Sequence, residues 1–372
     1  MASAHFLRNT WYAALWSEEL AEGALFSRTI LGEPLVFFRR TDGTVAAIAD
    51  RCPHRFAPLS RGKLLEDRIR CGYHGLEVDG TGRCVYNPHG NHHIPPAAAV
   101  ESYRVVERHS VLWIWMGERE PDFDAIPPFF EYDDDVPPPY VGRRDYLMIE
   151  ANYELIVDNL LDLSHTSYLH PGILGNDEMK TADNLFSQDG NTVTTGRRND
   201  NVPCPGLYDP LFRGDGGNVD KWNAMTWYPA SNLKLDSGVC PVGGSREQGT
   251  GIVAAHLLTP ETERTTHYLF SSSRWNVLTE DDAANARIRK EMSDTRYFVF
   301  SEQDGPMIEG QQRNIDRVAQ TREPRFALLA VDVATVRYQR ILHTLIEEEQ
   351  HERRRQEDRP AHDPVRDLRS HR

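Results

Sequence analysis

The chain has 372 residues, of which 39% are hydrophobic, so it can bury a large core and most simply folds as two domains. Its 42 Lys and Arg residues stand against 56 Asp and Glu, and the net charge of −14 argues against nucleic acid or an anionic membrane as the main partner. No apolar run is long enough to span a bilayer and no signal peptide is evident, so the sequence predicts a cytoplasmic protein without membrane association.

The first predicted elements are short β-strands. Residues 24–49, 76–86 and 102–117 are rich in β-branched and aromatic side chains, and turn sequences such as TDG and DGTG interrupt them. We therefore expect an all-β domain over residues 1–120.

Two Cys–His pairs lie inside this β-rich region, in the stretch CPHRFAPLSRGKLLEDRIRCGYHGL. Cys52 and His54 form a C-x-H pair, and sixteen residues later Cys71 and His74 form a C-x2-H pair. A structural zinc site uses the same donor set, and two buried thiols beside two ordinary histidines are the simplest alternative. However, two thiolates on one iron and two imidazoles on the other are what a Rieske [2Fe–2S] cluster requires, and C-x-H is an unusual zinc hairpin. The spacing therefore favours a Rieske cluster, which accepts and passes single electrons.

The five cysteines support a metal-binding interpretation. An odd number of cysteines in a long chain without a secretory signal favours reduced thiols or metal ligands over a disulfide framework. Of the five, Cys84, Cys204 and Cys240 have no partner at a recognisable spacing.

A Pro-rich and acidic segment over residues 121–140 is predicted to be a linker. The second domain, over residues 141–345, mixes helical periodicity at 151–170 and 281–318 with strand-like runs at 191–198, 251–260 and 265–275, which indicates an α+β fold. Residues 346–372 are almost wholly charged and polar, and we expect them to end a helix and then fray.

The segment DNLLDLSHTSYLHPG carries the second cluster of candidate ligands. Asn159, Asp162 and His165 recur every three residues and would share one stripe of a helix. His170 joins the same site only if the helix ends first, which Pro171 favours. Two imidazoles and one carboxylate with open coordination positions form the facial triad of non-haem iron(II) oxygenases. The carboxylate must come from elsewhere, and Glu302, Asp304 and Glu309 are all candidates on sequence chemistry.

In this order and separation, the two motifs resemble the oxygenase component of Rieske non-haem iron oxygenases, especially the aromatic O-demethylase branch that includes vanillate and dicamba demethylases. The resemblance covers about residues 5–345 and implies a Rieske domain followed by an α+β catalytic domain with an antiparallel, helix-grip-like sheet. It selects Asp304, followed five residues later by Glu309, as the third ligand, although Gln303 departs from the usual Glu-Asp pair.

The resemblance also implies an assembly and a reaction. A homotrimer would place His74 of one subunit against Asp162 of the next, where Asp162 bridges to His165. Electrons would come from NAD(P)H through a reductase or ferredoxin, and dioxygen would be the co-substrate in O- or N-dealkylation of a small aromatic compound. The alternatives are a dioxygenase that dihydroxylates or angularly attacks an aromatic ring, and a Rieske electron carrier without catalytic iron.

Two further residues are predicted to bind the substrate. Asn232 and His256 lie in strand-like runs whose alternation would aim both into one cavity. By resemblance to the dicamba-type enzyme, their amide and imidazole would hold a carboxylate or another polar group of the aromatic substrate.

Overall fold

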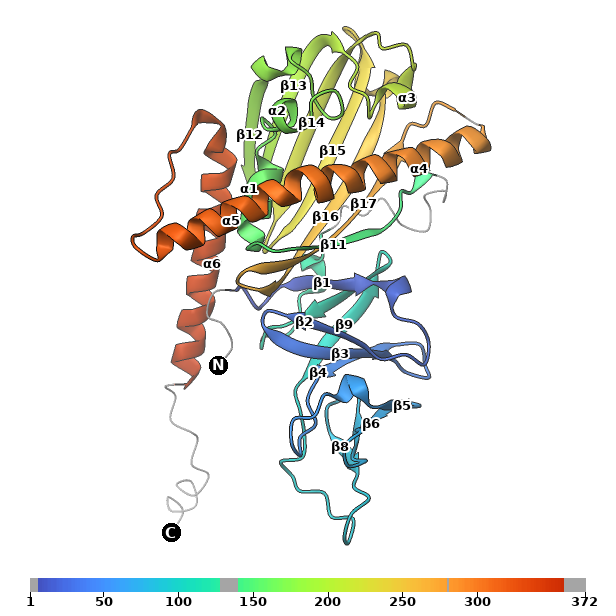
Figure 1. Ribbon diagram of the computed structural model, residues 1–372, viewed down its shortest axis with the longest axis vertical. Coiled ribbons are helices and arrows are strands. Elements are labelled where there is room, and N and C mark those ends of the chain that lie inside the picture. The colour runs from blue at the N-terminus through green and yellow to red at the C-terminus, as the bar shows by residue number, and fades with distance from the viewer. Residues whose placement is uncertain (1–5, 128–139, 280, 358–372) are drawn as a thin grey trace, which may run out of the picture.

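The computed structural model describes residues 6–127, 140–279 and 281–357 (Figure 1). Most of the predicted linker, residues 128–139, lies outside the described residues, as do the last fifteen residues of the predicted charged tail. No helix in the described ranges is long and apolar enough to cross a membrane.

The N-terminal strands form two antiparallel sheets, as the alternation of apolar runs and turns predicts. The larger sheet has the order β1-β10-β9-β4-β3-β2 and the smaller one the order β5-β6-β7-β8. The strands are β1 Trp11–Trp16, β2 Phe26–Ile30, β3 Glu33–Arg39, β4 Val45–Ala49, β5 Lys63–Leu65, β6 Arg68–Arg70, β7 Glu77–Asp79, β8 Cys84–Tyr86, β9 Ser102–Arg108 and β10 Val111–Trp115.

A seven-stranded antiparallel sheet forms the centre of the second domain, in the order β11-β17-β16-β15-β14-β13-β12. Its strands are β11 Asp145–Ile149, β12 Asp183–Asp189, β13 Thr192–Pro203, β14 Asn218–Tyr228, β15 Asn232–Pro241, β16 Thr250–Thr262 and β17 Thr265–Trp275. The α+β fold with an antiparallel sheet is therefore confirmed.

Helices cover one face of this sheet (Figure 1). They are α1 Tyr153–Leu161, α2 Thr166–Leu169, α3 Asp209–Phe212, α4 Asp282–Phe298, α5 Gly305–Ala319 and α6 Val333–Glu357. The helical pattern predicted for residues 281–318 becomes α4 and α5, joined without a break by the π-helical segment η7, Val299–Asp304. Short 3-10 turns occur at Ser17–Glu19, Leu59–Arg61, Phe123–Ala125, Glu178–Thr181, Arg246–Gln248 and Ala330–Asp332.

The two domains share a layer of buried aromatic side chains. The alternation of β1 and β10 turns Trp11, Trp113 and Trp115 away from the rest of the N-terminal core, and they pack against the catalytic sheet. We call this set the tryptophan layer, and its partners from β16 and β17 are Ala255, Leu257 and Leu269.

Hydrogen bonds from side chains of one domain to backbone carbonyls of the other join the domains at the same place. The indole N–H of Trp16 donates to the carbonyl of Asp145 at 3.0 Å, and the hydroxyl of Thr259 donates to the carbonyl of Ala13 at 2.7 Å. Buried apolar contact and these side-chain-to-backbone hydrogen bonds thus fix the Rieske sheet against the face of the catalytic sheet that carries Leu257.

Helix α6 contacts both domains. The Tyr338 hydroxyl donates to Oδ1 of Asp158 on α1 at 2.6 Å. Further along the helix, the buried Glu349 accepts hydrogen bonds from the backbone N–H groups of Arg8 and Asn9. The first part of the predicted charged tail is therefore helical and packed against the N-terminal segment.

Candidate cluster site, iron site and substrate cavity

Two loops with the same backbone pattern present the four predicted cluster ligands. The N–H of Cys52 donates to the carbonyl of Ala57, five residues on, and the N–H of Cys71 donates in the same way to Leu76, both at 2.8 Å. The residue four positions after each cysteine has a positive φ, 55° at Phe56 and 75° at Gly75. Two equivalent turns therefore face each other across a single site.

The side chains of these loops converge. The rings of His54 and His74 lie 4.7 Å apart between centroids, and both Cys52 and Cys71 are buried. Burial, followed by a hydrogen bond with the Cys71 thiol, raises the pKa of Cys52 to about 11. Two adjacent buried thiols beside two imidazoles fit a cluster in which thiolates and imidazoles bind the two irons.

His89 supports one of these loops. Its Nε2 lies 2.7 Å from the carbonyl of His74 and donates to it. The imidazole of His74 is therefore held at the tip of a loop whose backbone is itself tied down.

The two predicted histidine ligands lie at the two ends of the short helix α2, which follows a break after α1. We expected Asn159, Asp162 and His165 on one continuous helix, but α1 ends at Leu161, with Asp162 as its C-cap at φ −86° and ψ 83°. His165 is then the N-cap of the short helix α2. The continuous stripe was wrong because the Asp162 carboxylate accepts from the N–H and hydroxyl of Ser164, a local turn that competes with the helix.

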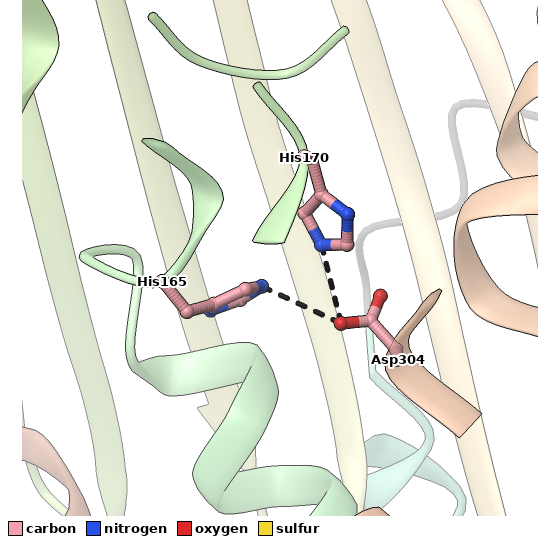
Figure 2. A group of neighbouring side chains, drawn as sticks. All are labelled: His165, His170 and Asp304. Carbon is pink, nitrogen blue, oxygen red and sulfur yellow. Dashed lines mark ion pairs between the residues drawn. The ribbon is translucent and has the colours of Figure 1, made fainter. Parts of the chain in front are cut away.

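The structure nevertheless brings the two histidines together with Asp304. Helix α2 ends at Leu169, so the chain turns at His170 as the neighbouring Pro171 predicts. Nε2 of His170 lies 3.2 Å and Nε2 of His165 lies 3.6 Å from the same carboxylate oxygen of Asp304 (Figure 2). One donor atom from each of the three residues lies within 4.8 Å of the others, an arrangement that suits one metal ion.

The buried Nε2 of His170 is the observation that best fits a metal. It has no hydrogen-bond partner among the described residues, because its approach to Asp304 lacks hydrogen-bond geometry. Burial lowers the pKa of His165, so this imidazole is favoured in the neutral form that binds metal. Of the three candidate carboxylates, Glu302 is exposed and Glu309 accepts from the backbone N–H of Glu150.

Three neighbours hold these side chains in orientation. The amide oxygen of Gln303 accepts from Nδ1 of His170 at 2.8 Å, and the backbone carbonyl of Asp162 accepts from Nδ1 of His165. Asn159 donates from Nδ2 to Oδ1 of Asp304 at 3.1 Å. Both imidazoles therefore carry their proton on Nδ1 and present a bare Nε2 to the site.

The π-helical segment places Asp304. In this segment the N–H of Gly305 donates to the carbonyl of Phe300, five residues back, while Pro306 has no N–H to give to the carbonyl of Glu302. The wider turn directs Gln303 and Asp304 toward His170, where a uniform α-helix would rotate one of them away.

An apolar cavity begins at the three candidate ligands. Its polar lining includes Asn159, His165, His170, Asp304 and His256, and its walls are largely aliphatic and aromatic: Leu160, Leu163, Leu174, Leu207, Met225, Leu235, Ile252, Ala254, Val299 and Phe300. Such a cavity accepts an aromatic ring and excludes most water.

Of the two predicted substrate residues, only His256 lines this cavity. Asn232 pairs with Leu257 across β15 and β16, whereas His256 pairs with Leu233. Paired residues share a face, so Asn232 lies on the face of Leu257, which packs in the tryptophan layer. The expectation that both residues point into one cavity was wrong, because Leu233 and not its neighbour Asn232 is on the same face as His256.

Tyr268, which the sequence analysis missed, fixes the tautomer of His256. Its hydroxyl lies 2.6 Å from Nδ1 of His256, and no other described group accepts the Tyr268 proton. Tyr268 therefore donates to Nδ1, and the ring proton of His256 is on Nε2, a buried atom that has no partner among the described residues. Burial, followed by the charge of Arg296, lowers the pKa of His256 to about 3, so the ring is a neutral donor.

A Rieske-type cluster domain joined to a two-histidine, one-carboxylate site defines the class of Rieske non-haem iron oxygenases. Residues 10–104 match the model of the Rieske [2Fe-2S] domain, and residues 149–348 match that of the vanillate O-demethylase oxygenase C-terminal domain. The chain belongs to this family of oxygenase components.

Individual relatives agree with this assignment. The chain is 38% identical to the dicamba O-demethylase oxygenase component of Stenotrophomonas maltophilia, over 91% of this chain and 98% of that one. It is 36% identical to the iron-sulfur subunit TsaM1 of the toluene-4-sulfonate monooxygenase system of Comamonas testosteroni, over 84% and 90%. A crystal structure of dicamba monooxygenase bound to 3,6 dichlorosalicylic acid superposes with a TM-score of 0.84 at 36% identity, over 93% and 99%.

Proposed function

We propose that this oxygenase component removes an alkyl group, most simply an O-methyl or N-alkyl group, from a small aromatic compound. The main observation behind this proposal is that His165, His170 and Asp304 lie in the wall of an apolar cavity, which is formed between the helices and the sheet. The relatives named as vanillate and dicamba O-demethylases support the reaction type.

The [2Fe–2S] cluster would be held by Cys52, His54, Cys71 and His74, and the mononuclear iron(II) by His165, His170 and Asp304. When bound, the cluster supplies single electrons and the iron supplies the activation of dioxygen. One oxygen atom enters a C–H bond of the alkyl group, two electrons and two protons take the other to water, and the hydroxylated group leaves as an aldehyde.

The residues of the chain position and protect this reaction. Gln303 and the Asp162 carbonyl orient the two imidazoles, and Asn159 orients the carboxylate. The aliphatic walls hold the substrate ring and keep water away from the reacting C–H bond. His256 donates from Nε2 to a polar group of the substrate.

Electrons are proposed to reach the iron from a second subunit. Within one chain, the loops beside β5–β8 lie at the far end of the molecule from α1 and α2 (Figure 1). His54 is exposed, and Phe56 and Tyr73 beside the ligands are 72% and 65% exposed, as a docking face requires. In the proposed homotrimer, His74 of one subunit meets Asp162 of the next, and a reductase or ferredoxin reloads the cluster with electrons from NAD(P)H.

A substrate panel tests this proposal. The protein is combined with a surrogate reductase, NADH and methoxylated, N-alkylated or unsubstituted aromatics, and formaldehyde and hydroxylated products are measured together. Dealkylation predicts one formaldehyde per methoxylated substrate consumed. Ring diols without formaldehyde would instead indicate a dihydroxylase. A chain with about two irons and no turnover would indicate an electron carrier, because the complete oxygenase holds about three.

A further inference from the structure

Basic side chains gather around the cluster site, although the chain as a whole is acidic. Between Arg51 and Glu77 there are six Lys and Arg residues against three Asp and Glu, whereas the whole chain has a net charge of −14. Five of the six basic residues are exposed. We call these five the basic face: Arg55, Arg61, Lys63, Arg68 and Arg70. A local charge opposite in sign to the rest of the molecule attracts a partner to that place.

Three residues of the basic face lie on one side of the small Rieske sheet. Lys63 pairs with Arg70 across β5 and β6, and Arg68 lies two residues from Arg70 on the same side of β6. Ile69, between the two arginines, points the other way and is buried in the core of the domain. The outer side of this sheet therefore presents cationic groups to solvent.

One buried carboxylate orients both arginines. Glu77 on β7 is 3% exposed, and its two oxygens lie 2.8 Å from Nε of Arg68 and 2.8 Å from Nη2 of Arg70. In the part of the chain that the structure describes, no other carboxylate pairs with either arginine. Two positive charges thus share one negative charge, and guanidinium N–H groups on the solvent side are available to the carboxylates of a partner.

The remaining basic residues border the two cluster loops. The backbone carbonyl of Arg61 packs against Gly72 of the second loop, where an added Cβ atom would lie only 3.1 Å away. Neither Arg61 nor Lys63 forms an ion pair with a described carboxylate. Arg55 directly follows the proposed ligand His54 in the first loop. Positive charge therefore lies beside both loops.

The nearby acids belong to turns at the ends of the strands. Asp67 lies between β5 and β6, and its carboxylate accepts from the N–H and hydroxyl of Thr41. Asp79 ends β7 and accepts from the N–H and hydroxyl of Thr81. Glu66 is exposed in the turn between β5 and β6 and balances only part of the positive charge. An excess of positive charge therefore remains on the outer side of this sheet.

Two exposed aromatic rings complete the surface. Phe56 and Tyr73 lie in the two cluster loops and expose most of their side chains. A small apolar centre with an exposed rim of Lys and Arg suits a transient electron-transfer encounter, whereas permanent subunit contacts bury larger and more apolar surfaces that are depleted of Lys. The composition of the basic face thus favours a partner that binds and leaves over a permanently bound second copy of the chain.

We propose that the basic face binds the protein that donates electrons to the cluster, and that this donor presents a carboxylate-rich surface around its own redox centre. The inference rests on the proposed function, because it specifies the electron donor of the same oxygenase component. Positive charge beside the cluster loops steers an acidic donor to the cluster and away from the rest of this acidic chain. One electron then passes from the reduced donor to the oxidised cluster, and no bond is made or broken.

Electron transfer between the holoprotein and two carriers of opposite charge tests this inference. Stopped-flow absorbance follows reduction of the oxidised cluster by reduced plant-type [2Fe–2S] ferredoxin, an acidic protein whose reduction potential lies below that of a Rieske cluster. It also follows oxidation of the reduced cluster by ferric cytochrome c, a basic protein. Both reactions are measured without dioxygen or substrate, at low ionic strength and at about 1 M salt, where the Debye length is about 3 Å.

Two double variants are compared with the wild type. Arg61→Glu with Lys63→Glu reverses two charges of the basic face and leaves no buried carboxylate unpaired, because neither residue pairs with Glu77. Arg313→Glu with Arg317→Glu, at exposed positions on α5 in the other domain, makes the same change in net charge. The absorbance and the reduction potential of the cluster show whether each variant keeps the same redox centre.

The wild type is expected to accept electrons from ferredoxin faster at low than at high salt. Reversal at Arg61 and Lys63 should slow this reaction by about tenfold or more at low salt and should accelerate the reaction with cytochrome c. At about 1 M salt the differences should largely disappear, and the control variant should behave as the wild type does throughout. Binding of the oxidised carriers to the immobilised holoprotein should give the same order of affinities without electron transfer.

Three results would overturn the inference. They are a ferredoxin reaction that the reversal leaves unchanged, equal slowing with both carriers, and a reversal variant that elutes from gel filtration as a smaller oligomer than the wild type. The last result would assign the basic face to a second copy of the chain.

Dealkylation is tested separately from docking. Holoprotein reduced by dithionite needs no donor protein, so formaldehyde from a single turnover supports the proposed reaction whatever the basic face binds. Fast, salt-dependent reduction by ferredoxin without any formaldehyde would contradict the proposed reaction and leave the docking surface standing.

Discussion

The amide oxygen of Gln303 accepts a hydrogen bond from Nδ1 of His170 at 2.8 Å. The two residues come from different helices, and the bond sets which nitrogen of the imidazole faces Asp304. Gln303 stands where the family resemblance leads one to expect a glutamate, and its amide oxygen can accept the same proton.

Replacing Gln303 should therefore weaken the iron site through His170. Gln303→Leu removes the acceptor, and loss of such a partner typically costs about 10–100-fold in metal affinity. Gln303→Glu keeps an acceptor and should retain iron. Titration of iron(II) into protein stripped of mononuclear iron measures the effect, with the cluster absorbance as an internal control. Equal iron affinity in Gln303→Leu and wild type would show that this hydrogen bond is dispensable.

His165→Ala and Asp304→Ala should each abolish turnover and remove the mononuclear iron, because each loses a proposed ligand. The cluster ligands lie in the other domain, so the Rieske absorbance should persist. Metal analysis should fall from about three irons per chain to about two. Retained activity in either variant would refute the assignment of the triad.

Asp162→Asn should retain both metal centres and slow electron transfer. The backbone carbonyl of Asp162, which the substitution preserves, accepts from His165, while the carboxylate accepts from Ser164. The side chain is therefore available to a neighbouring subunit without being required to orient the iron ligand. Single-turnover oxidation of the reduced cluster in the presence of substrate gives the rate. A normal rate would exclude a bridging role.

His256→Ala should raise KM for the true substrate by an amount worth about 1–3 kcal/mol, because a buried donor aimed into the cavity is lost. Asn232→Ala serves as the comparison, since Asn232 is equally buried on the opposite face of the sheet. It should lower thermal stability and leave KM unchanged. Steady-state kinetics and melting curves on both variants separate the two effects, and the reverse pattern would restore Asn232 to the substrate site.

Asp158 should make stability depend on pH. Burial raises the pKa of Asp158 from 3.8 to about 7, so the folded chain holds a proton that the unfolded chain releases between these values. The free energy of unfolding contributed by this group is fully present below about pH 4 and is lost as pH rises through 7. Asp158→Asn imitates the protonated form and can still accept from Tyr338.

Melting temperatures at pH 5 and pH 8 check this expectation. The advantage of Asp158→Asn over wild type should be larger at pH 8, by a few degrees. Asp282→Asn, at an exposed position, controls for the change in net charge. A difference between Asp158→Asn and wild type that is the same at both pH values would mean that Asp158 does not change its protonation state between pH 5 and pH 8, which would contradict a pKa of about 7.

Much of this protein's organisation can be predicted from the spacing of residues in the sequence. Cys52, His54, Cys71 and His74 lie in two short loops, and the chemistry of a Rieske cluster requires those residue types at those separations. The N-terminal β-fold, the antiparallel sheet and the long helices also follow from periodicity and turn residues. These features depend on neighbours in the sequence.

Two kinds of feature could not be predicted from periodicity: local side-chain hydrogen bonds that end a helix, and the register of strands that pair in the folded protein. The break at Asp162 arises from a competing hydrogen bond with Ser164, and helical periodicity does not report it. Asn232 was assigned to the wrong face of the sheet, because only the register between β15 and β16 shows that it shares a face with Leu257 and not with His256. Lys221 on β14 and Tyr208 just before α3 both donate to the hydroxyl of Ser237 on β15. Strand alternation places Lys221 and Asn223 on one face of β14, but it does not show that these three residues meet.

The tryptophan layer has a consequence for protein engineering. Trp11, Trp113 and Trp115 belong to strands that are hydrogen-bonded in the Rieske sheet, but their side chains pack against the catalytic sheet. Neither domain therefore has a complete hydrophobic core of its own. Cutting the chain in the segment around residues 121–140 would expose three indoles at once. Replacing the Rieske domain by that of a relative should therefore succeed only when the residues of β16 and β17 that face the tryptophan layer are replaced with it. Thermal unfolding of the intact chain should be a single cooperative transition that includes both domains.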